Sequence, residues 1–414
     1  MTNISKLQAP RLLTTDFKSI FLPLYNASET LKSPSQSSTD IPKIGQLALN
    51  IYSPTIKIPQ YENLLCQEMG RKQNNYDIHQ SVKSFWFSGS PLNQLSPEAI
   101  TELCFRFSNH FPHSNELDTV RGISARGSEL NTNTLALLAG LKFNCLEIYI
   151  DASIASNDRS LSKVEKGLGL IADYEQIKLN FKIGFSDQTH PDYLMRLLKL
   201  LESADCQQIE LVCKQSRDLY GTSDLTIAEK QLLEINEYFA QRGWLSCGNN
   251  FFYSPQHENN ELYRQRKLLL TPWGYHDQAT QTQLGVGVGA LSLIGKSLEL
   301  NTVNPESYQQ SINERQVLAT TQFTLDPLCD HLIQLVQNLV CYRQTNANVC
   351  NDTFDNTHDF SDLITALVNR GELEPEGDIL KLTDKGLINL TAISKFLFSQ
   401  ANIEDYNDDN IQKY

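Results

Sequence analysis

The sequence predicts an α/β fold in which an open parallel sheet or partial barrel is followed by a small helical unit. Six short apolar runs alternate with amphipathic stretches between about residues 47 and 243, which is typical of β/α units. A helix, two short strands and a last helix are indicated near the C-terminus. The chain has 414 residues, of which 40% are hydrophobic, enough for two or three domains with well-formed cores.

The six apolar runs are the predicted strands: 47–53, 84–89, 119–125, 145–151, 177–185 and 207–213. Between them, Ser96 and Pro97 form an N-cap and first helical residue. Gly243 marks the end of the last amphipathic stretch. Six strands are too few for a closed eight-stranded barrel, so we expect an open sheet or partial barrel with ligands at the carboxyl ends of its strands.

The chain divides into four expected segments. Residues 31–42 are rich in Ser and Pro and mark a linker, whereas the helix–ribbon–helix pattern around Gly377 predicts a winged-helix-like end. The four segments are an N-terminal arm and linker at 1–44, a partial β/α barrel at 45–300, a C-terminal helical domain at 301–400 and a disordered tail at 401–414.

Charge and cysteine usage exclude several classes of protein. There are 35 Lys and Arg against 48 Asp and Glu, a net charge of −13, which argues against a nucleic-acid binder. The net acidic segment 374–386 likewise argues against nucleic-acid binding by the winged-helix-like end. No apolar stretch is long enough to span a membrane, and the N-terminus has no apolar signal core. The nine cysteines are odd in number and scattered, which favours a reducing cytoplasm.

A glycine-rich segment, residues 284–295, is the most specific stretch of the chain. With the Gly-Tyr-His-Asp run before it, the stretch 274–295 resembles the G-Y-T-T … L-L-G-x-G-x-S-A-I-S-x-I-G signature of the oxygen-independent coproporphyrinogen III oxidases, a radical S-adenosylmethionine (SAM) family. Residues 323–343 resemble L-T-x-D-D-x-x-R-R-x-x-I-x-x-L-I-C-N-F, with Cys341 on the family's Cys. Residues 382–390 resemble L-T-x-K-G-R-x-L.

The resemblance runs from about residue 45 to residue 398. It implies a partial (β/α)6 barrel of the radical SAM type, a helical C-terminal domain and a part in porphyrin or haem metabolism. Such enzymes hold a four-iron four-sulfur cluster and S-adenosylmethionine at the carboxyl ends of the strands.

The cluster cysteines of the family are missing from this sequence. The family places C-x3-C-x2-C directly after its first strand, because three thiolates hold the cluster and leave one iron open. Here residues 54–65 contain no cysteine, and Cys66 stands alone. Three dispersed cysteines, Cys104, Cys145 and Cys213, are the alternative ligands if they converge in space.

The positions that would contact S-adenosylmethionine are also altered. Gly89 is retained from the family's Gly-Gly-Gly turn, but Phe87 replaces its first glycine, and we expect its ring to crowd the cofactor. The family's acidic and amide contacts fall on Ser124, Asp151 and Asn180. We therefore expect a degenerate cofactor site, no bound metal and no catalytic residue.

Five residues are candidates for binding a ligand that carries carboxylates, as the family's substrate does. Arginines bind carboxylates well, and an imidazole can ligate haem iron or donate to a carboxylate. Glycines allow close backbone approach. The candidates are Arg264, Arg266, His276, Gly285 and Gly287.

Three hypotheses follow from this pattern. The first is a coproporphyrinogen oxidase-like protein that has lost its cluster and binds a tetrapyrrole, haem or porphyrin, or a protein partner. The second is an active oxygen-independent coproporphyrinogen III oxidase with unorthodox cluster ligands. The third is a non-catalytic partner that regulates an active paralogue.

Overall fold

Six parallel strands in sequential order form the centre of the protein. In the computed structural model they are β2 (Leu47–Ser53), β3 (Val82–Gly89), β4 (Val120–Arg126), β5 (Cys145–Asp151), β6 (Lys178–Phe185) and β7 (Gln208–Cys213). Each lies within two residues of its predicted run. The structure describes residues 25–28, 46–76, 82–111, 119–153, 157–213, 226–248, 250–280, 282–295, 297–314, 320–325, 330–346 and 358–399.

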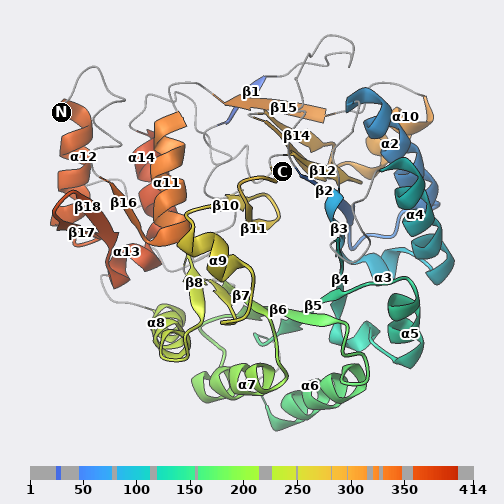
Figure 1. Ribbon diagram of the computed structural model, residues 1–414, viewed down its shortest axis with the longest axis horizontal. Coiled ribbons are helices and arrows are strands. Elements are labelled where there is room, and N and C mark those ends of the chain that lie inside the picture. The colour runs from blue at the N-terminus through green and yellow to red at the C-terminus, as the bar shows by residue number, and fades with distance from the viewer. Residues whose placement is uncertain are drawn as a thin grey trace.

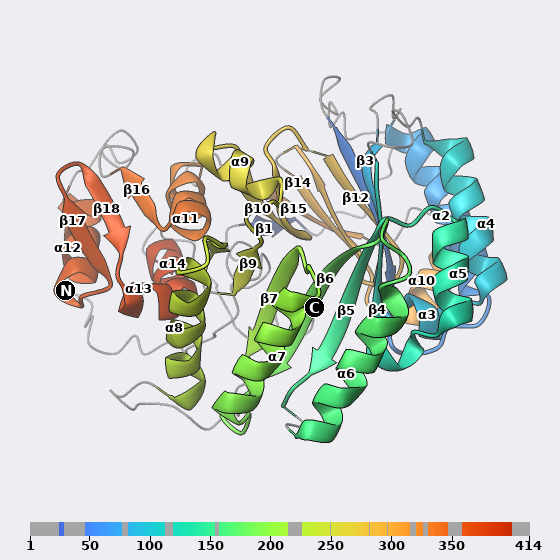
Figure 2. The same ribbon diagram turned by 60° about the horizontal axis from the view of Figure 1, so that its bottom comes forward.

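The helices between these strands lie on the outer face of the sheet, as Figures 1 and 2 show. The curved sheet therefore has one face covered by helices and one concave face, the arrangement predicted for a partial barrel. The helical elements are α2 (Tyr61–Tyr76), α3 (Pro91–Gln94), α4 (Pro97–His110), η3 (Gly127–Glu129), α5 (Thr132–Gly140), α6 (Asp158–Ile171), α7 (Pro191–Ser203) and α8 (Ile227–Ala240).

Further strands extend the sheet at both edges. Beside β2 the order is β12 (Thr282–Val286), parallel to it, and then the antiparallel β13 (Leu291–Ile294), β14 (Ser297–Asn301), β15 (Thr320–Leu325) and β1 (Tyr25–Ser28). Beside β7 lie β9 (Phe251–Tyr253) and β8 (Leu245–Cys247), followed in sequence by α9 (Asn259–Arg264) and the hairpin of β10 (Leu268–Thr271) and β11 (Gly274–Asp277).

The strands β1 and β15 are absent from the prediction. The prediction places residues 25–28 within an arm and residues 320–325 within a helical region, whereas the two segments pair with each other. The rest of the arm and residues 401–414 lie outside the described residues.

The C-terminal unit contains the predicted helix, ribbon and helix. Two short strands meet at a turn that contains Gly377, whose φ is +61°. The elements are α10 (Pro305–Asn313), α11 (Asp330–Tyr342), β16 (Gln344–Asn346), α12 (His358–Asn369), β17 (Leu373–Glu376), β18 (Ile379–Leu382), α13 (Asp384–Ile388) and α14 (Leu390–Ser399).

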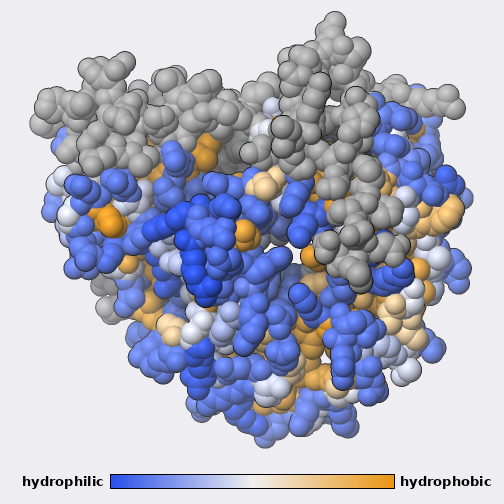
Figure 3. All heavy atoms as spheres, in the orientation of Figure 1, coloured by the Kyte–Doolittle hydropathy of each residue, from blue (hydrophilic) through white to orange (hydrophobic). Residues whose placement is uncertain are grey.

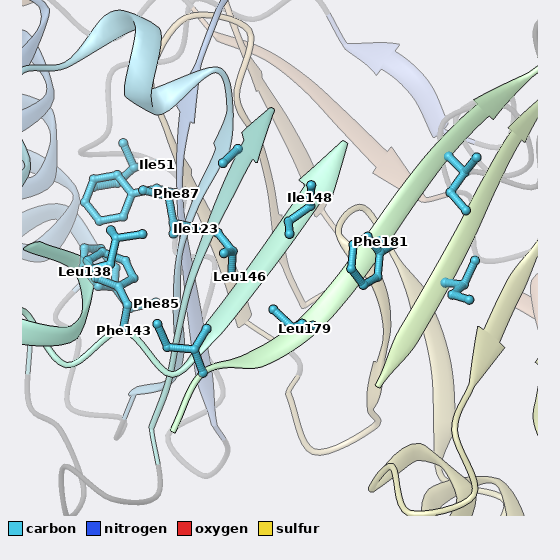
Figure 4. Close-up of a cluster of buried hydrophobic side chains, with 14 of the residues drawn as sticks. Ile51, Phe85, Phe87, Ile123, Leu138, Phe143, Leu146, Ile148, Leu179 and Phe181 are labelled. Carbon is cyan, nitrogen blue, oxygen red and sulfur yellow. The ribbon is translucent and has the colours of Figure 1, made fainter. Parts of the chain in front are cut away.

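The main core lies between the parallel strands and the helices, as Figure 4 shows. Alternate strand residues such as Phe85, Ile123 and Leu146 point toward the helices and are buried. Phe85 stacks on Phe107 of α4 with ring centroids 3.9 Å apart. Because successive side chains of a strand point to opposite faces, the residues between these face the concave side. No helix in the described part of the chain is long and apolar enough to cross a bilayer.

Substituting Gly122 tests how tightly the concave face is packed. A Cβ at this position would lie 2.0 Å from the indole ring of Trp86. We expect Gly122→Ala to lower the free energy of unfolding by about 1–3 kcal/mol, because the ring must move. The control is Gly167→Ala on α6, where an added Cβ meets nothing within 4 Å and a better helix former replaces glycine. Urea denaturation measures both, and equal stability of Gly122→Ala and the unmodified protein would contradict the packing described.

Candidate functional site

The concave face carries a chain of polar side chains across β3, β4 and β5. The indole N–H of Trp86 donates to Ser124 Oγ at 3.3 Å, and that hydroxyl donates to Glu147 Oε1 at 2.8 Å. Ser124 therefore lies in the middle of the face and is engaged on both sides. The indole fits because Gly122, its register neighbour on β4, has no side chain.

Asn180 lies beside this chain on β6, in register with Glu147. Its amide nitrogen donates to Cys145 Sγ at 3.4 Å, and its Oδ1 is buried without a hydrogen-bond partner. Burial raises the pKa of the Cys145 thiol to about 12. Cys145 is therefore a neutral thiol at neutral pH and not a thiolate.

Gly89 and Asp151 lie at the carboxyl ends of β3 and β5. Gly89 has a φ of +81°, and a Cβ there would lie 2.2 Å from the carbonyl oxygen of Ser53. This glycine is therefore required by the close approach of the ends of β2 and β3. Asp151 accepts from the backbone N–H and the hydroxyl of Ser153 at 3.2 and 2.5 Å.

The expectation that Phe87 crowds the cofactor position is wrong. Its ring points toward the helices, where it is fully buried and packs against Phe85 and Phe143, as Figure 4 shows. The reason is strand alternation: Phe87 is two residues from Phe85, so it shares the helix-facing side.

The loop after β2, where the family places its cluster cysteines, is held by contacts to α3. Lys57 Nζ donates to the carbonyl of Asn93 at 3.1 Å, and Asn93 Nδ2 donates back to the carbonyl of Thr55 at 3.3 Å. The amide of Gln94 donates to the carbonyl of Ile58 at 3.2 Å. These contacts fix residues 54–60 against α3 without any thiol in the loop.

Cys66 lies on α2 and not at the carboxyl end of a strand. Burial raises the pKa of its thiol, and the nearest charges are Arg106 and Glu102 of α4 together with Glu62. Cys66 therefore belongs to the contact between α2 and α4.

The three cysteines considered as alternative ligands do not converge. Cys145 is in register with Lys178 and Cys213 with Phe185, seven residues further along β6. At about 3.3 Å per residue, the two thiols are about 23 Å apart along the strands. Cys213 packs in the helix-facing core, as does Cys104 on α4. No three His, Cys, Asp or Glu side chains in the described ranges are grouped to hold a metal ion, and Cys329 and Cys350 lie outside those ranges.

Gly285 and Gly287 engage a buried ion pair on α2. Glu68 and Lys72 are 0% and 1% exposed and approach to 3.3 Å. Glu68 Oε2 accepts from the backbone N–H of Gly287 at 2.8 Å, and Lys72 Nζ donates to the carbonyl of Gly285 at 2.5 Å. A Cβ at Gly287 would lie 2.4 Å from the hydroxyl of Tyr61. The backbone of the glycine-rich segment thus packs directly against α2.

Three further elements contact the same ion pair. Asn301 Nδ2 of β14 donates to Glu68 Oε1 at 2.7 Å, and the hydroxyl of Tyr308 on α10 donates to Oε2 at 2.5 Å. Lys72 also donates to Ser292 Oγ of β13 at 3.1 Å. The pair therefore joins α2 to β12, β13, β14 and α10.

His276 lies on β11, which leads to the amino-terminal end of β2, and Arg264 and Arg266 precede the hairpin of β10 and β11. The carbonyl of Ala279, two residues after β11, accepts from the backbone N–H of Gln46, the residue before β2. Arg264 is exposed and paired with Glu261 at 3.0 Å, and the guanidinium of Arg266 lies over the ring of Tyr342 at 4.5 Å. Gly287, in contrast, follows the carboxyl end of β12, which runs parallel to β2.

A second histidine, His257, lies near His276. Burial, then Lys178 and His276, lower the pKa of His257 to about 4, and burial lowers the pKa of His276. Both imidazoles are therefore neutral at neutral pH. His257 Nδ1 accepts from the backbone N–H of Asn259 at 3.1 Å, whereas His276 Nε2 is 3.4 Å from the carbonyl of Trp273 and donates to it. His276 Nδ1 thus keeps its lone pair.

Four residues that hold these sites together were not identified from the sequence. They are Glu147 on the concave face, Glu68 and Lys72 beneath the glycine-rich segment, and His257 beside His276. Glu147 stands between Leu146 and Ile148 in the middle of β5, and a carboxylate between apolar strand residues is the signal that could have identified it. Glu68 and Lys72 are four residues apart on one helix, a common surface pattern, so their spacing gives no sign of burial. His257 has no motif around it.

Comparison with solved structures decides the fold. Coproporphyrinogen III oxidase (HemN) from Escherichia coli, described as a radical SAM enzyme, matches with a TM-score of 0.73 at 17% identity, over 91% of this chain and 98% of that chain. This chain has the coproporphyrinogen III oxidase fold. No family model and no curated protein matches the sequence.

Two other solved structures match this chain with far lower TM-scores than HemN does. TsrM, a radical S-adenosylmethionine methyltransferase from Kitasatospora setae, has a TM-score of 0.23 at 13% identity, over 37% of this chain and 28% of that chain. HydG, a maturase of the [FeFe]-hydrogenase, has a TM-score of 0.28 at 6% identity, over 51% and 54%.

The residues at the expected cluster position of this fold do not fit a four-iron four-sulfur cluster. A cluster of the family's kind needs three thiolates on one short loop, and residues 54–60 supply none. The side chains that hold this loop are Lys57, Asn93 and Gln94, which are donors of hydrogen bonds and not iron ligands.

Removing the cation of the buried pair tests its role in the glycine-rich segment. We expect Lys72→Met to lower the free energy of unfolding by about 3–5 kcal/mol, because it leaves Glu68 buried without its counter-charge. The matched control is Arg106→Met, which breaks the Glu102–Arg106 pair at the same i,i+4 spacing on an exposed helix face and should change stability very little. Urea denaturation compares the two, and similar losses would refute the assigned role.

Proposed function

We propose that this protein is a coproporphyrinogen oxidase-like protein that works without an iron–sulfur cluster or radical chemistry and binds a tetrapyrrole. The observation that carries the proposal is the combination of the fold, shared over 91% of the chain, with a thiol-free loop after β2. A scaffold that keeps the whole architecture but not the cluster ligands is suited to binding and not to reductive cleavage of S-adenosylmethionine.

The altered cofactor positions support the loss of radical activity. Ser124 stands where the family has a glutamate, and its hydroxyl is already engaged by Trp86 and Glu147. Asp151 is engaged by Ser153. Ser124 and Asp151 are each bonded to neighbouring residues of this chain, which leaves fewer groups to hold the amino-acid end of S-adenosylmethionine.

His276 is the residue best suited to a haem or porphyrin ligand. Its imidazole is neutral, and Nδ1 keeps the lone pair that iron coordination requires. Of the two arginine candidates, we favour Arg266. Its guanidinium lies over the ring of Tyr342, and this contact holds the side chain in place. It can serve a carboxylate of the ligand.

Titration with haem and with coproporphyrin III tests the proposal. We expect dissociation constants of about 1 μM or below for at least one of them, measured by the shift of the Soret band. His276→Ala should weaken haem binding about tenfold or more, whereas the control His190→Ala, at an exposed position beside α7, should not.

Absence of binding by either compound contradicts the tetrapyrrole role. The remaining form of the hypothesis is then a protein partner, such as an active paralogue. Co-purification of this chain from its native host distinguishes that role, since it requires a stable complex in the absence of added tetrapyrrole.

A further inference from the structure

Glu147 on the concave face has a carboxylate without a cation. Its one hydrogen bond is from Ser124, and no described Lys, Arg or His forms an ion pair with it. The side chain is half-buried on β5, one strand away from Ser124 and one from Asn180. A carboxylate held in a protein interior is costly unless a positive group or several donors compensate it.

A buried acceptor without a donor lies next to this carboxylate. Asn180 is 8% exposed, and its Oδ1 has no hydrogen-bond partner. Asn180 and Glu147 are register partners on adjacent parallel strands and face the same side, so their Cβ atoms are about 5 Å apart. Buried amide oxygens are nearly always bonded in folded proteins, so this acceptor calls for a donor.

An aromatic surface completes the arrangement. Trp86 is held by its bond to Ser124 and by the missing side chain of Gly122, and its ring is half-buried. The indole N–H already donates to the hydroxyl of Ser124, so only the ring of Trp86 is left to contact a ligand on the concave face. Among aromatic side chains, the face of tryptophan attracts cations most strongly.

No nearby cation in the described part of the chain forms an ion pair with Glu147. Lys182, two residues after Asn180 on β6, bonds to Glu210 at 2.8 Å. Lys178, two residues before it, is exposed at the start of the strand. Arg126 lies at the end of β4, and it too is exposed. The central part of the face therefore presents two acceptors and a ring, without a cation of its own. Figure 3 shows that the face of the molecule seen in Figure 1 is largely hydrophilic.

We propose that Glu147 and Asn180 bind the ammonium group of an organic amine, and that Trp86 receives the apolar body attached to it. The N–H donors of the ammonium satisfy the orphaned Oδ1 and the carboxylate together, and its charge neutralises Glu147. Neither the porphyrin contacts proposed above nor the glycine-rich segment takes part, so this site stands or falls independently of tetrapyrrole binding.

The experiment is calorimetric titration of the full chain with benzylammonium, which combines an ammonium group and a ring. Benzyl alcohol is the uncharged probe of similar shape. We expect benzylammonium to bind with one site per chain, and benzyl alcohol to bind at least about tenfold more weakly, because the alcohol cannot neutralise Glu147.

Variants assign the binding to the proposed residues. Glu147→Gln keeps an acceptor for Ser124 but removes the charge, and it should weaken benzylammonium about tenfold or more. Asn180→Leu removes the orphaned acceptor and should weaken it by a smaller factor. Glu175→Gln makes the same chemical change at an exposed position and should leave binding unchanged. Circular dichroism melting confirms that each variant is folded.

Three results would overturn the proposal. They are no heat of binding with benzylammonium up to about 10 mM, equal affinity for the amine and the alcohol, and unchanged affinity in a folded Glu147→Gln variant. Porphyrin binding can succeed or fail in each of these cases, so the two proposals are tested separately.

Discussion

The buried pair of Glu68 and Lys72 determines how the sheet continues beyond its first parallel strand. Both charges lie on α2 without access to solvent, so every remaining donor and acceptor around them must come from the protein. The backbone of the glycine-rich segment supplies two of these contacts, and β13, β14 and α10 supply the others. The glycines are needed because backbone must approach the pair directly, and at Gly287 a Cβ would collide with Tyr61. The most specific stretch of the sequence is therefore explained by packing against one helix.

The six parallel strands could be predicted because each is a short, nearly continuous apolar run. A run of this length is typical of a buried strand and too short for a helix. The helix α2 gives only a weak helical signal, because its core-facing side carries Glu68 and Lys72, which interrupt the apolar period. The helix α6 also gives a weak signal, because Gly167 and Gly169 lower its helical propensity. The pairing of β1 with β15 joins segments about 300 residues apart, and local sequence contains no signal for contacts at that separation.

The positions of the candidate site could be predicted from the sequence, but the contacts of its side chains could not. Ser124, Asp151 and Asn180 could be assigned through the resemblance, and all three belong to the strands around the concave face. What they contact could not be predicted, because the contacts depend on strand register: Ser124 bonds to Glu147 only because β4 and β5 pair with that offset. Register likewise separates Cys145 from Cys213, although the sequence left their convergence open. Strand alternation placed the ring of Phe87 in the helix layer, where it has no influence on a ligand.

The central claim is that this fold operates here without an iron–sulfur cluster, and cluster reconstitution tests it most directly. The full chain would be incubated anaerobically with ferrous iron, sulfide and a thiol reductant, then desalted and assayed for bound iron, labile sulfide and absorbance near about 400 nm. The account predicts sub-stoichiometric iron and no distinct band, because residues 54–60 supply no thiolate and the described cysteines are dispersed. Four irons and four sulfides bound per chain, with reductive cleavage of added S-adenosylmethionine, would contradict it.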